Sequence, residues 1–333
     1  MANQVTISIP TFNQKEFICR ALISALKQDY SDIEIDIHDD SNIEDYSDEI
    51  AKFSKDKNVN YFKNKNTLGM VSNYRKGLDH ATGKYFLNLD GDDELIDESF
   101  ISKAVNLLEK YPSCVAVIGG QRIIKDSLLI REDTMTDKEY IILSSYEFLL
   151  LSLSDKSPVL PHFSTLIRAK NAKKAQYYSK DIVNTDLHSI RNLSLYGEVI
   201  FINNICGNWH INDSNQSRDF CPIKFSENIS CLTDPYLNAL DAFKDKDFTN
   251  ALKSSYVSGI KKFISDNYSL ALRSKDYKKS ILNFQNNLTS FLPPEFSDFA
   301  KLTKYPRIKR NLFIRNTIGF KLYNSIANLK QRL

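Results

Sequence analysis

The chain has 333 residues, of which 42% are hydrophobic and 26% are charged, values that are ordinary for a soluble globular protein. This length allows one large domain, or one domain with an appendage. With 10 glycines and neither a G-x-G-x-x-G nor a Walker-type stretch, the sequence argues against dinucleotide-binding and P-loop chemistry. The 5 cysteines lack C-x-x-C or zinc-type spacing, which favours free thiols in a reducing cytoplasm.

The net charge of +3 is unevenly distributed along the chain. Residues 301–333 hold nine of the 44 Lys and Arg residues and no acid, so residues 1–300 carry a net charge of −6, with 35 basic against 41 acidic residues. This asymmetry argues against a nucleic-acid-binding body and for a basic tail with its own role. The sequence predicts no signal peptide, and no apolar run approaches the ~18 residues of a membrane-spanning helix.

Strands and helices are predicted to alternate over the first hundred residues. The predicted strands are 5–9, 33–38, 59–62 and 85–89, and the predicted helices are 16–28, 44–55 and 71–81. A helix from residue 98, the strand "CVAVIGG" and a mixed region follow, and beyond about residue 220 the chain reads mainly as helix. This alternation is typical of a parallel α/β sheet with right-handed crossovers. We expect an α/β domain at 1–218 and a mainly helical region with a basic tail at 219–333.

Polar clusters follow three of the predicted strands. They are Thr11-Phe12-Asn13, Asp39-Asp40-Ser41 and the acids from Asp90 to Asp93. Ligands of open α/β sheets bind outside the carboxyl ends of the strands. Three such clusters at three strand ends therefore predict a binding site along this edge of the sheet.

The stretch "DGDD" places three carboxylates, Asp90, Asp92 and Asp93, within four positions. One interpretation is a solvated acidic turn in which Gly91 supplies the permissive backbone. The other is a site for Mg²⁺ or Mn²⁺, which take hard oxygen ligands and often share them with substrate phosphates.

The surrounding sequence favours the second interpretation. The stretches "SIPTFNQ", "DIHDDSN" and "NTLGMVSNYRKGLDHATGKYFLNLDGDD" resemble, in order and spacing, the family 2 inverting glycosyltransferases of GT-A fold. The resemblance covers roughly residues 4–215. It implies a GT-A (Rossmann-like), mostly parallel sheet flanked by helices, with a helical C-terminal extension.

The resemblance also implies roles for individual residues. Donor-binding residues would be Thr11, Phe12, Asn13, Asp40, Asn73, Arg75, Asp90 and Gly91. Asp92 and Asp93 would lie beside Mn²⁺ or Mg²⁺, and His210 of "NWHINDSNQS" would face the metal or the diphosphate. The chain departs from many members of the family, which carry Arg-Asn where it has Tyr74-Arg75, and Asn73 and Arg75 would supply equivalent donors.

An inverting transfer needs one carboxylate to accept the proton of the acceptor hydroxyl. "NTDLHSIRNLSLYGEVIFIN" resembles the family's helix that opens on this base, which makes Asp186 the candidate. The alternative is that Asp186 only complements the helix dipole from the first turn. "LPHFSTLIRA" resembles the stretch that lines the acceptor side, with His162 and Thr165 as its candidate residues.

The basic tail has two interpretations. Ile308, Leu312, Gly319/Phe320, Tyr323 and Ile326 recur at helical intervals among Lys and Arg. They could dock a C-terminal helix on the body, or form an amphipathic helix at an anionic membrane surface.

We therefore expect a metal-dependent inverting glycosyltransferase of surface-polysaccharide synthesis, such as O-antigen or capsule. Its donor would be a nucleotide diphosphate sugar, with a UDP-linked hexose or N-acetylhexosamine as the expected donor, and its acceptor a glycan or a lipid-linked oligosaccharide. We expect it in the cytoplasm, with peripheral contact at the inner face of the membrane as a further expectation, and we expect no nucleic-acid partner. The alternatives are a nucleotidyltransferase and a non-catalytic nucleotide-sugar-binding module.

Overall fold

The computed structural model describes residues 4–53, 58–212, 221–318, 323–324 and 327. The chain divides into two compact units. The first comprises 1–149, 158–181 and 185–214, and the second comprises 150–157, 182–184 and 215–333. The boundary expected between residues 218 and 219 lies outside the described residues.

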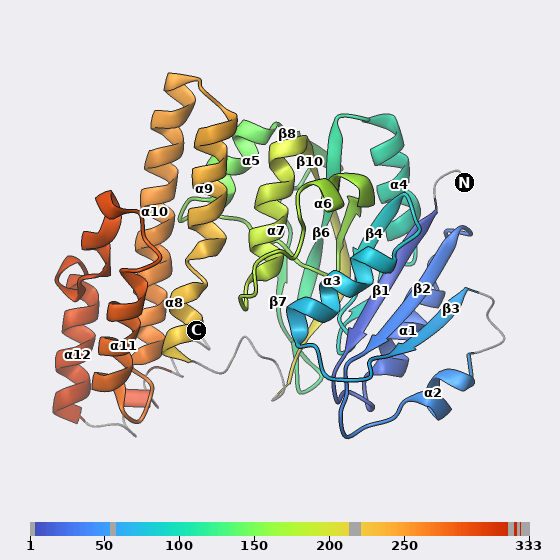
Figure 1. The fold of residues 1–333 in the computed structure, drawn as a ribbon, viewed down its shortest axis with the longest axis horizontal. Helices are drawn as coiled ribbons and strands as arrows, with labels where there is room; N and C mark the ends of the chain where they lie inside the picture. Colours follow the sequence, from blue (N-terminus) through green and yellow to red (C-terminus); the bar gives the residue numbers. More distant parts are fainter. Residues whose placement is uncertain (1–3, 54–57, 213–220, 319–322, 325–326, 328–333) are drawn as a thin grey trace. The chain divides into compact units, whose positions relative to one another are not determined.

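The first unit is built on one mixed sheet of ten strands in the described part of the chain, with the order β3-β2-β1-β4-β9-β6-β10-β5, while β7 pairs with β6 and β8 with β10 (Figure 1). The strands are β1 (Val5–Thr11), β2 (Ile33–Asp39), β3 (Val59–Lys63), β4 (Tyr85–Asn88), β5 (Glu94–Leu95), β6 (Cys114–Lys125), β7 (Leu128–Asp133), β8 (Tyr140–Leu143), β9 (Thr165–Arg168) and β10 (Glu198–Ile211). Strands β1 to β4 are parallel to one another, as are β6 and β10, whereas β9 runs antiparallel to both β4 and β6.

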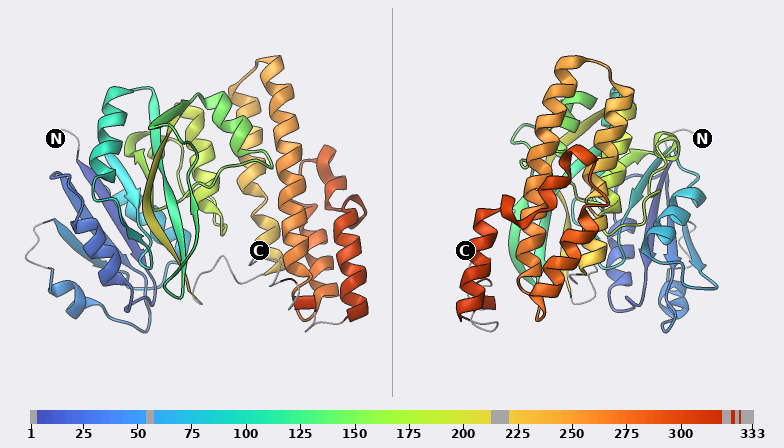
Figure 2. Two further views of the ribbon diagram at one scale, coloured as in Figure 1. Left: turned by 180° about the vertical axis from the view of Figure 1, so that it is seen from behind. Right: turned by 60° about the vertical axis from the view of Figure 1, so that its left-hand side comes forward.

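Helices cover both faces of this sheet. They are α1 (Ile18–Leu26), α2 (Ser47–Ala51), α3 (Met70–His80), α4 (Phe100–Lys110), α5 (Ser145–Ser152), α6 (Ala169–Lys174) and α7 (Thr185–Leu193). Figure 2 shows helices on both sides of the sheet. One hydrophobic cluster joins the sheet to α1 and α4, and the other joins it to α3, α6 and α7. The alternation of β1 explains the two faces. Val5, Ile7 and Ile9 belong to the first cluster, whereas Ser8 faces α3 so closely that a Cβ on Gly77 would lie 2.2 Å from its Oγ.

The second unit is helical. Its helices are α8 (Pro222–Glu227), α9 (Ser230–Ala242), α10 (Lys246–Ala271), α11 (Tyr277–Leu288) and α12 (Pro306–Ile318). The side chain of Asp245 caps α10 by accepting a hydrogen bond from the Phe248 N–H at 2.7 Å. None of the helices in the described part of the chain is both long and apolar enough to cross a membrane.

The basic tail packs in part on this second unit. Ile308 is fully buried and Tyr323 is nearly so. The Arg315 guanidinium lies 4.3 Å from the centroid of the Tyr277 ring. Gly319, Phe320 and Ile326 lie outside the described residues. The described part of the tail therefore has a docked face, as the first of its two interpretations expects.

The α/β class with a helical C-terminal extension is confirmed. Two details differ from the expected elements. The helix expected at 44–55 begins only at Ser47, because the Asp45 carboxylate accepts hydrogen bonds from the Ser47 N–H at 2.8 Å and from its hydroxyl, and so forms a turn there. The region between the strand "CVAVIGG" and residue 220 contains β9, a strand of only four residues that was not predicted from the sequence.

Candidate active site

The three polar clusters lie together at the carboxyl ends of β1, β2 and β4. The Asp40 N–H donates to the Thr11 carbonyl oxygen at 2.9 Å, and the Gly91 N–H donates to the Pro10 carbonyl oxygen at 3.0 Å. A Cβ on Gly91 would lie 3.0 Å from the Thr11 side chain, closer than nearly all Cβ contacts. Backbone hydrogen bonds therefore join the loops that carry the predicted donor-binding residues.

Phe12 and Asn13 form the turn that follows β1. Asn13 adopts a left-handed φ of 53°, which asparagine tolerates better than most residues. Its N–H donates to Ser41 Oγ at 2.7 Å, and its Nδ2 donates to Asn42 Oδ1 at 3.2 Å. This fixed turn leaves the ring of Phe12 43% exposed, so a planar ligand could stack on it.

Asp40 is buried, and protein groups already bind its carboxylate. Asp40 Oδ1 accepts from Asn64 Nδ2 and from the Leu68 N–H, each at 2.8 Å, and Oδ2 accepts from the Gly69 N–H at 2.9 Å. Asn73 joins the same network through its Oδ1, which accepts from Asn64 Nδ2 at 3.0 Å. Asp40 and Asn73 thus hold the loop between β3 and α3, and direct contact of either with a nucleobase stays a prediction.

Replacing Asp40 with Ala is expected to lower the free energy of unfolding of the first unit by about 3 kcal/mol. Three hydrogen bonds to a charged group are lost, and water replaces them only in part. Urea unfolding followed by the fluorescence of Trp209, the single tryptophan of the chain, measures this unit. Asp79→Ala, at an exposed position of α3, is the control. A loss below ~0.5 kcal/mol, the range of ordinary surface substitutions, would contradict this role.

The acid cluster, which is Asp90, Asp92 and Asp93, is largely shielded from solvent. Asp92 and Asp93 are only 6% and 3% exposed. Asp92 Oδ2 accepts from Asn212 Nδ2 at 2.7 Å, and Asp93 Oδ1 accepts from the His210 N–H at 3.0 Å. The two carboxylates are therefore held against the end of β10 and the residue that follows it.

Burial and mutual repulsion dominate the electrostatics of the acid cluster. Burial raises the pKa of the Asp92 carboxyl, and the charge of Asp90 raises it further. Burial also raises the pKa of the Asp93 carboxyl well above its ordinary value, with Asp92 and Asp90 adding to the effect. The charge of Arg20 lowers both pKa values, and its Nη2 donates to the Asp92 carbonyl oxygen. Such a cluster is stabilised either by protons or by a bound cation.

Asp90 lies in a different environment. His162 Nδ1 is 3.4 Å from Asp90 Oδ2, and His162 Nε2 is 2.5 Å from the Tyr178 hydroxyl oxygen. Burial acts to raise the pKa of Asp90, but the charge of His162 and hydrogen bonds from His162, Tyr74 and Asn88 outweigh it and lower the pKa. Burial acts to lower the pKa of His162, but the Asp90 charge outweighs it and raises the pKa. Asp90 is thus the acid that the protein keeps ionised.

Tyr178 has an unusual backbone. Its φ is 62°, in the left-handed region that bulky residues rarely adopt, which costs on the order of 1–3 kcal/mol. Its N–H donates to Ser189 Oγ at 2.8 Å, and its carbonyl oxygen accepts from Arg75 Nη2 at 2.6 Å. Arg75, an expected donor-binding residue, therefore binds the backbone that positions the hydroxyl partner of His162.

Asp186 lies in the first turn of α7, close enough to the acid cluster to share its electrostatics. Burial raises the pKa of the Asp186 carboxyl. The charges of His162 and Arg191 lower it, and that of Asp90 raises it. The structure thus brings Asp186, which lies 96 positions after Asp90, into the same site. A partly buried carboxyl whose pKa is raised is a stronger proton acceptor than an ordinary aspartate.

His210 and Thr165 are engaged with protein groups. His210 Nε2 is 3.0 Å from Glu94 Oε1, and Asn208 Nδ2 donates to the same oxygen at 2.7 Å. The hydrogen bond from His210 is the main reason why the pKa of Glu94 is lowered. The Thr165 hydroxyl donates to the Pro161 carbonyl oxygen at 2.5 Å and so fixes the turn before β9. A metal role for His210 and an acceptor role for Thr165 stay predictions.

The acid cluster offers the hard oxygen ligands that Mg²⁺ and Mn²⁺ take. Among the described residues, no group of three or more His, Cys, Asp and Glu side chains is arranged to hold a metal ion. Magnesium is commonly bound by one or two carboxylates together with substrate phosphates and water. The acid cluster fits that mode, in which the protein supplies part of the coordination shell.

Sequence reasoning missed three residues of this site. Arg20 is a cation on the helix after β1, and its position facing the strand ends was a usable signal. Asn212 lies in "HINDSN", directly beyond the predicted His210. Tyr178 carried no signal, because neither its backbone conformation nor its hydrogen bond to His162 can be inferred from residue type.

Comparison with known proteins identifies relatives. The chain is 30% identical over 149 residues to the GalNAc(5)-diNAcBac-PP-undecaprenol beta-1,3-glucosyltransferase of Campylobacter jejuni, covering 40% of this chain and 48% of that protein. It is 36% identical over 105 residues to the UDP-Glc:alpha-D-GlcNAc-diphosphoundecaprenol beta-1,3-glucosyltransferase WfaP of Escherichia coli, covering 32% of this chain and 41% of that protein. The matches span less than half the length of these relatives.

Solved structures show the same fold. Staphylococcus aureus TarS 1-349 in complex with UDP-GlcNAc has a TM-score of 0.73 at 14% identity, covering 93% of this chain and 91% of that chain. The mannosyltransferase PcManGT from Pyrobaculum calidifontis, in complex with GDP-Man and Mn²⁺, has a TM-score of 0.53 at 14% identity, covering 98% and 87%. At these identities the likeness establishes the GT-A fold alone.

The family model described as Glycosyl transferase family 2 matches residues 6–175. This range contains the loops that follow β1, β2 and β4, and it is just over half of the chain. The chain therefore belongs to glycosyl transferase family 2.

Proposed function

We propose that the chain is a metal-dependent, inverting glycosyltransferase that uses a UDP-linked sugar, a hexose or an N-acetylhexosamine. The observation that carries this proposal is the position of Asp186, a partly buried carboxyl with a raised pKa, in the same site as the acid cluster. A site that only binds a nucleotide sugar has no need of such a carboxyl. Family membership supports the reaction class.

In the proposed reaction the acceptor hydroxyl oxygen attacks the anomeric carbon from the face opposite the diphosphate. The bond between that carbon and the diphosphate oxygen breaks, and its electron pair leaves with the nucleoside diphosphate. Asp186 takes the proton of the acceptor hydroxyl. Phe12 and Asn13 would face the nucleobase of the donor, with Asp40 nearby. Asp90 would also bind the donor, and its pairing with His162 keeps its carboxylate ionised.

Asp92 and Asp93 would hold the divalent ion, Mn²⁺ or Mg²⁺, with His210 beside them. When bound, the ion would offset the charge of the diphosphate. Protein groups would act with it, because Arg20 already places a positive charge near Asp92 and Asp93.

We propose a lipid-linked oligosaccharide of surface-polysaccharide synthesis, such as O-antigen or capsule, as the acceptor. The names of the Campylobacter jejuni and Escherichia coli relatives both refer to a diphosphoundecaprenol-linked sugar. The TarS structure contains UDP-GlcNAc, which supports a UDP-linked donor.

A donor screen that measures released nucleoside diphosphate tests the reaction. Nucleotide sugars are incubated with the full chain and candidate acceptors, with Mn²⁺ and with a chelator. We expect release that depends on the ion and on one UDP-sugar. Release of pyrophosphate would identify a nucleotidyltransferase, and tight donor binding without turnover would identify a binding module. Either result would overturn the proposal.

We also propose that α12 contacts an anionic membrane surface at the cytoplasmic face. Phe313 is 70% exposed and Ile314 is 37% exposed. The exposed cations Arg307, Lys309 and Arg310 lie on the same helix. Exposed apolar residues among cations are typical of helices that lie on membranes. Such contact would bring the enzyme to a lipid-linked acceptor.

Reversing the charges of Arg307, Lys309 and Arg310 to Glu is expected to weaken binding to anionic vesicles roughly 100-fold. Each basic residue near the surface contributes about 1 kcal/mol, and the buried Ile308 is untouched. Vesicle sedimentation of the full chain measures the change.

The control carries the same number of reversals at exposed lysines of α10 and the preceding turn, which are Lys244, Lys246 and Lys262. Equal loss in both variants would show attraction by net charge alone. Equal sedimentation of the wild type with neutral and with anionic vesicles would contradict the membrane proposal.

A further inference from the structure

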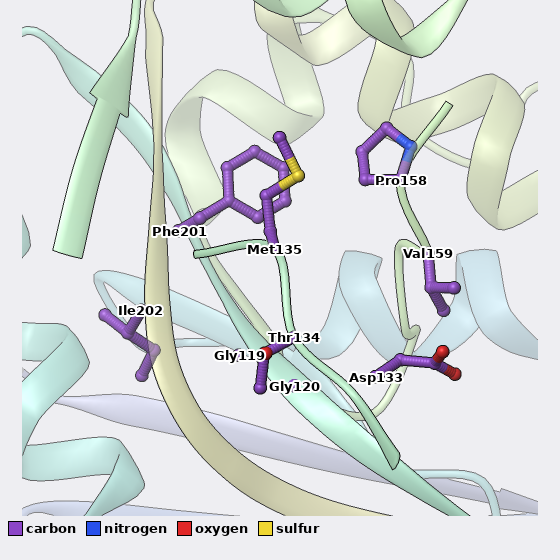
Figure 3. A pocket seen from close by; sticks show the side chains of 9 residues that line it. All are labelled: Gly119, Gly120, Asp133, Thr134, Met135, Pro158, Val159, Phe201 and Ile202. Atoms are coloured by element: carbon purple, nitrogen blue, oxygen red, sulfur yellow. The ribbon is translucent and has the colours of Figure 1, made fainter. Parts of the chain in front are cut away.

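A pocket of about 110 Å³ lies beside β6 in the first unit, apart from the acid cluster (Figure 3). Its wall is mostly apolar and includes Met135, Val159, Phe201 and Ile202. Among its described lining residues, Asp133, at the end of β7, is the one with a charged side chain. The residues discussed above as donor-binding, catalytic or metal-associated do not line it.

The chain connects this pocket to the candidate active site. Val159 lines the pocket, and His162, only three residues later, bonds to Asp90. Three residues span at most about 11 Å, so the segment that lines the pocket is close along the chain to the side chain that contacts Asp90. Gly119, which lines the pocket, donates from its N–H to the Ser164 carbonyl oxygen at 2.8 Å, which fixes the loop between the two.

The pocket also lies on the half of the sheet away from the predicted nucleobase site. Strand β6 is separated from β1 by β4 and β9, three steps of about 4.8 Å each. Met135 and Phe201 belong to the hydrophobic cluster under α7, the helix that carries Asp186. A ligand in this pocket is therefore on the side of Asp186, the proposed general base, where the acceptor must approach.

The lining selects the chemistry of the ligand. None of the described lining residues is Lys, Arg or His, and Asp133 would repel a phosphate. An engineered cavity of about 150 Å³ in another protein binds benzene, so this pocket of about 110 Å³ holds a group of roughly four heavy atoms. An acetamido group has this size, an N–H for a carboxylate and a methyl for an apolar wall.

We propose that this pocket binds the acetamido group of an N-acetylated amino sugar in the acceptor. Asp133 would accept a hydrogen bond from the amide N–H, while Met135, Phe201 and Val159 contact the methyl group. The Asp133 carboxylate is already oriented by Arg131 Nε at 3.0 Å and Gln121 Nε2 at 3.3 Å, and a carboxylate has about four acceptor positions. This inference rests on the proposed transfer to a glycan acceptor.

Ligand-observed saturation-transfer NMR on the full chain with UDP tests the pocket without turnover. The probes are the methyl glycosides of N-acetylglucosamine and glucose. We expect saturation to be strongest at the acetamido methyl, and the acetamido sugar to bind at least about tenfold more tightly. Val159→Trp, which fills the partly exposed rim, should weaken its binding about tenfold, and Asp133→Asn should do the same.

Leu129→Trp, at an exposed position of β7 outside the pocket, is the matched control. Equal binding of both glycosides, or equal affinity in the Val159 and Leu129 variants, overturns the inference. If the acetamido preference is found but no donor is turned over, the proposed reaction fails and the pocket stands as a sugar site. If turnover is found with both acceptor types equally, the pocket assignment alone fails.

Discussion

Asp186→Asn is expected to lower turnover by about two to four orders of magnitude, the usual contribution of a general base. The amide keeps the shape of the carboxylate but cannot take the proton of the acceptor hydroxyl. Affinity for the donor should stay within about twofold, because Asp186 acts on the acceptor. Single-turnover transfer and donor binding by calorimetry measure the two effects separately.

Asp181→Asn is the matched control, since Asp181 is exposed and only five residues away. The pH profile gives a second readout. The active base is ionised, so activity is lost as pH falls through the pKa of Asp186. Because burial raises that pKa, the acid limb should lie above that of an ordinary aspartate. The charge of His162 lowers the pKa of Asp186, so His162→Gln should move the acid limb of the pH profile to still higher pH. Unchanged turnover in Asp186→Asn would rule out this base.

Mn²⁺ is expected to raise the melting temperature of the first unit by roughly 5–10 °C at one hundred times its dissociation constant, which corresponds to about 2.7 kcal/mol. The ion would relieve the repulsion between the buried carboxylates of Asp92 and Asp93. Asp92→Asn should abolish most of this shift, whereas Asp79→Asn on the surface of α3 should retain it. Thermal unfolding followed by Trp209 fluorescence, with Mn²⁺ and with chelator, is the measurement.

The stability of the ion-free protein should depend on pH because the pKa values of two buried carboxyls are shifted. The pKa values of Asp92 and Asp93 are higher in the folded than in the unfolded chain. Their contribution to stability is therefore present below the unfolded pKa and is lost as pH rises through the folded values. Stabilisation by the ion should grow over that same range, because the ion competes with protons. An equal shift for wild type and Asp92→Asn would contradict a metal role for Asp92.

Much of the first half of the fold could be predicted from local sequence. The strands β1, β2 and β4 are short apolar runs that end at polar clusters, and these signals depend on neighbouring residues only. The same clusters predicted that Thr11, Asp40 and Asp90 would meet at one edge, and hydrogen bonds between their loops confirm this. The parallel topology places strand ends together without further information.

The second half of the fold and most side-chain contacts of the site could not be predicted, because they depend on contacts between residues that are distant in the sequence. Strand β9 has four residues and lies between β4 and β6 only because the sheet leaves that space. The partners of His162, Asp90 and Tyr178, lie 72 and 16 residues away, and sequence spacing predicts neither. Likewise, Asp40 looked like a free ligand group, whereas its oxygens are used by a loop that only the folded chain brings to it.

The position of β9 has a consequence for engineering. Strands β3, β2, β1 and β4 come from the first 88 residues, and β6 and β10 come from later ones. The two blocks meet at a seam where β4 pairs with β9 through Tyr85–Arg168 and Phe86–Ile167. A chimaera joined after β4 would exchange one whole block of the sheet, and it would need to preserve these two pairs and the two hydrophobic clusters, which contain residues of both blocks.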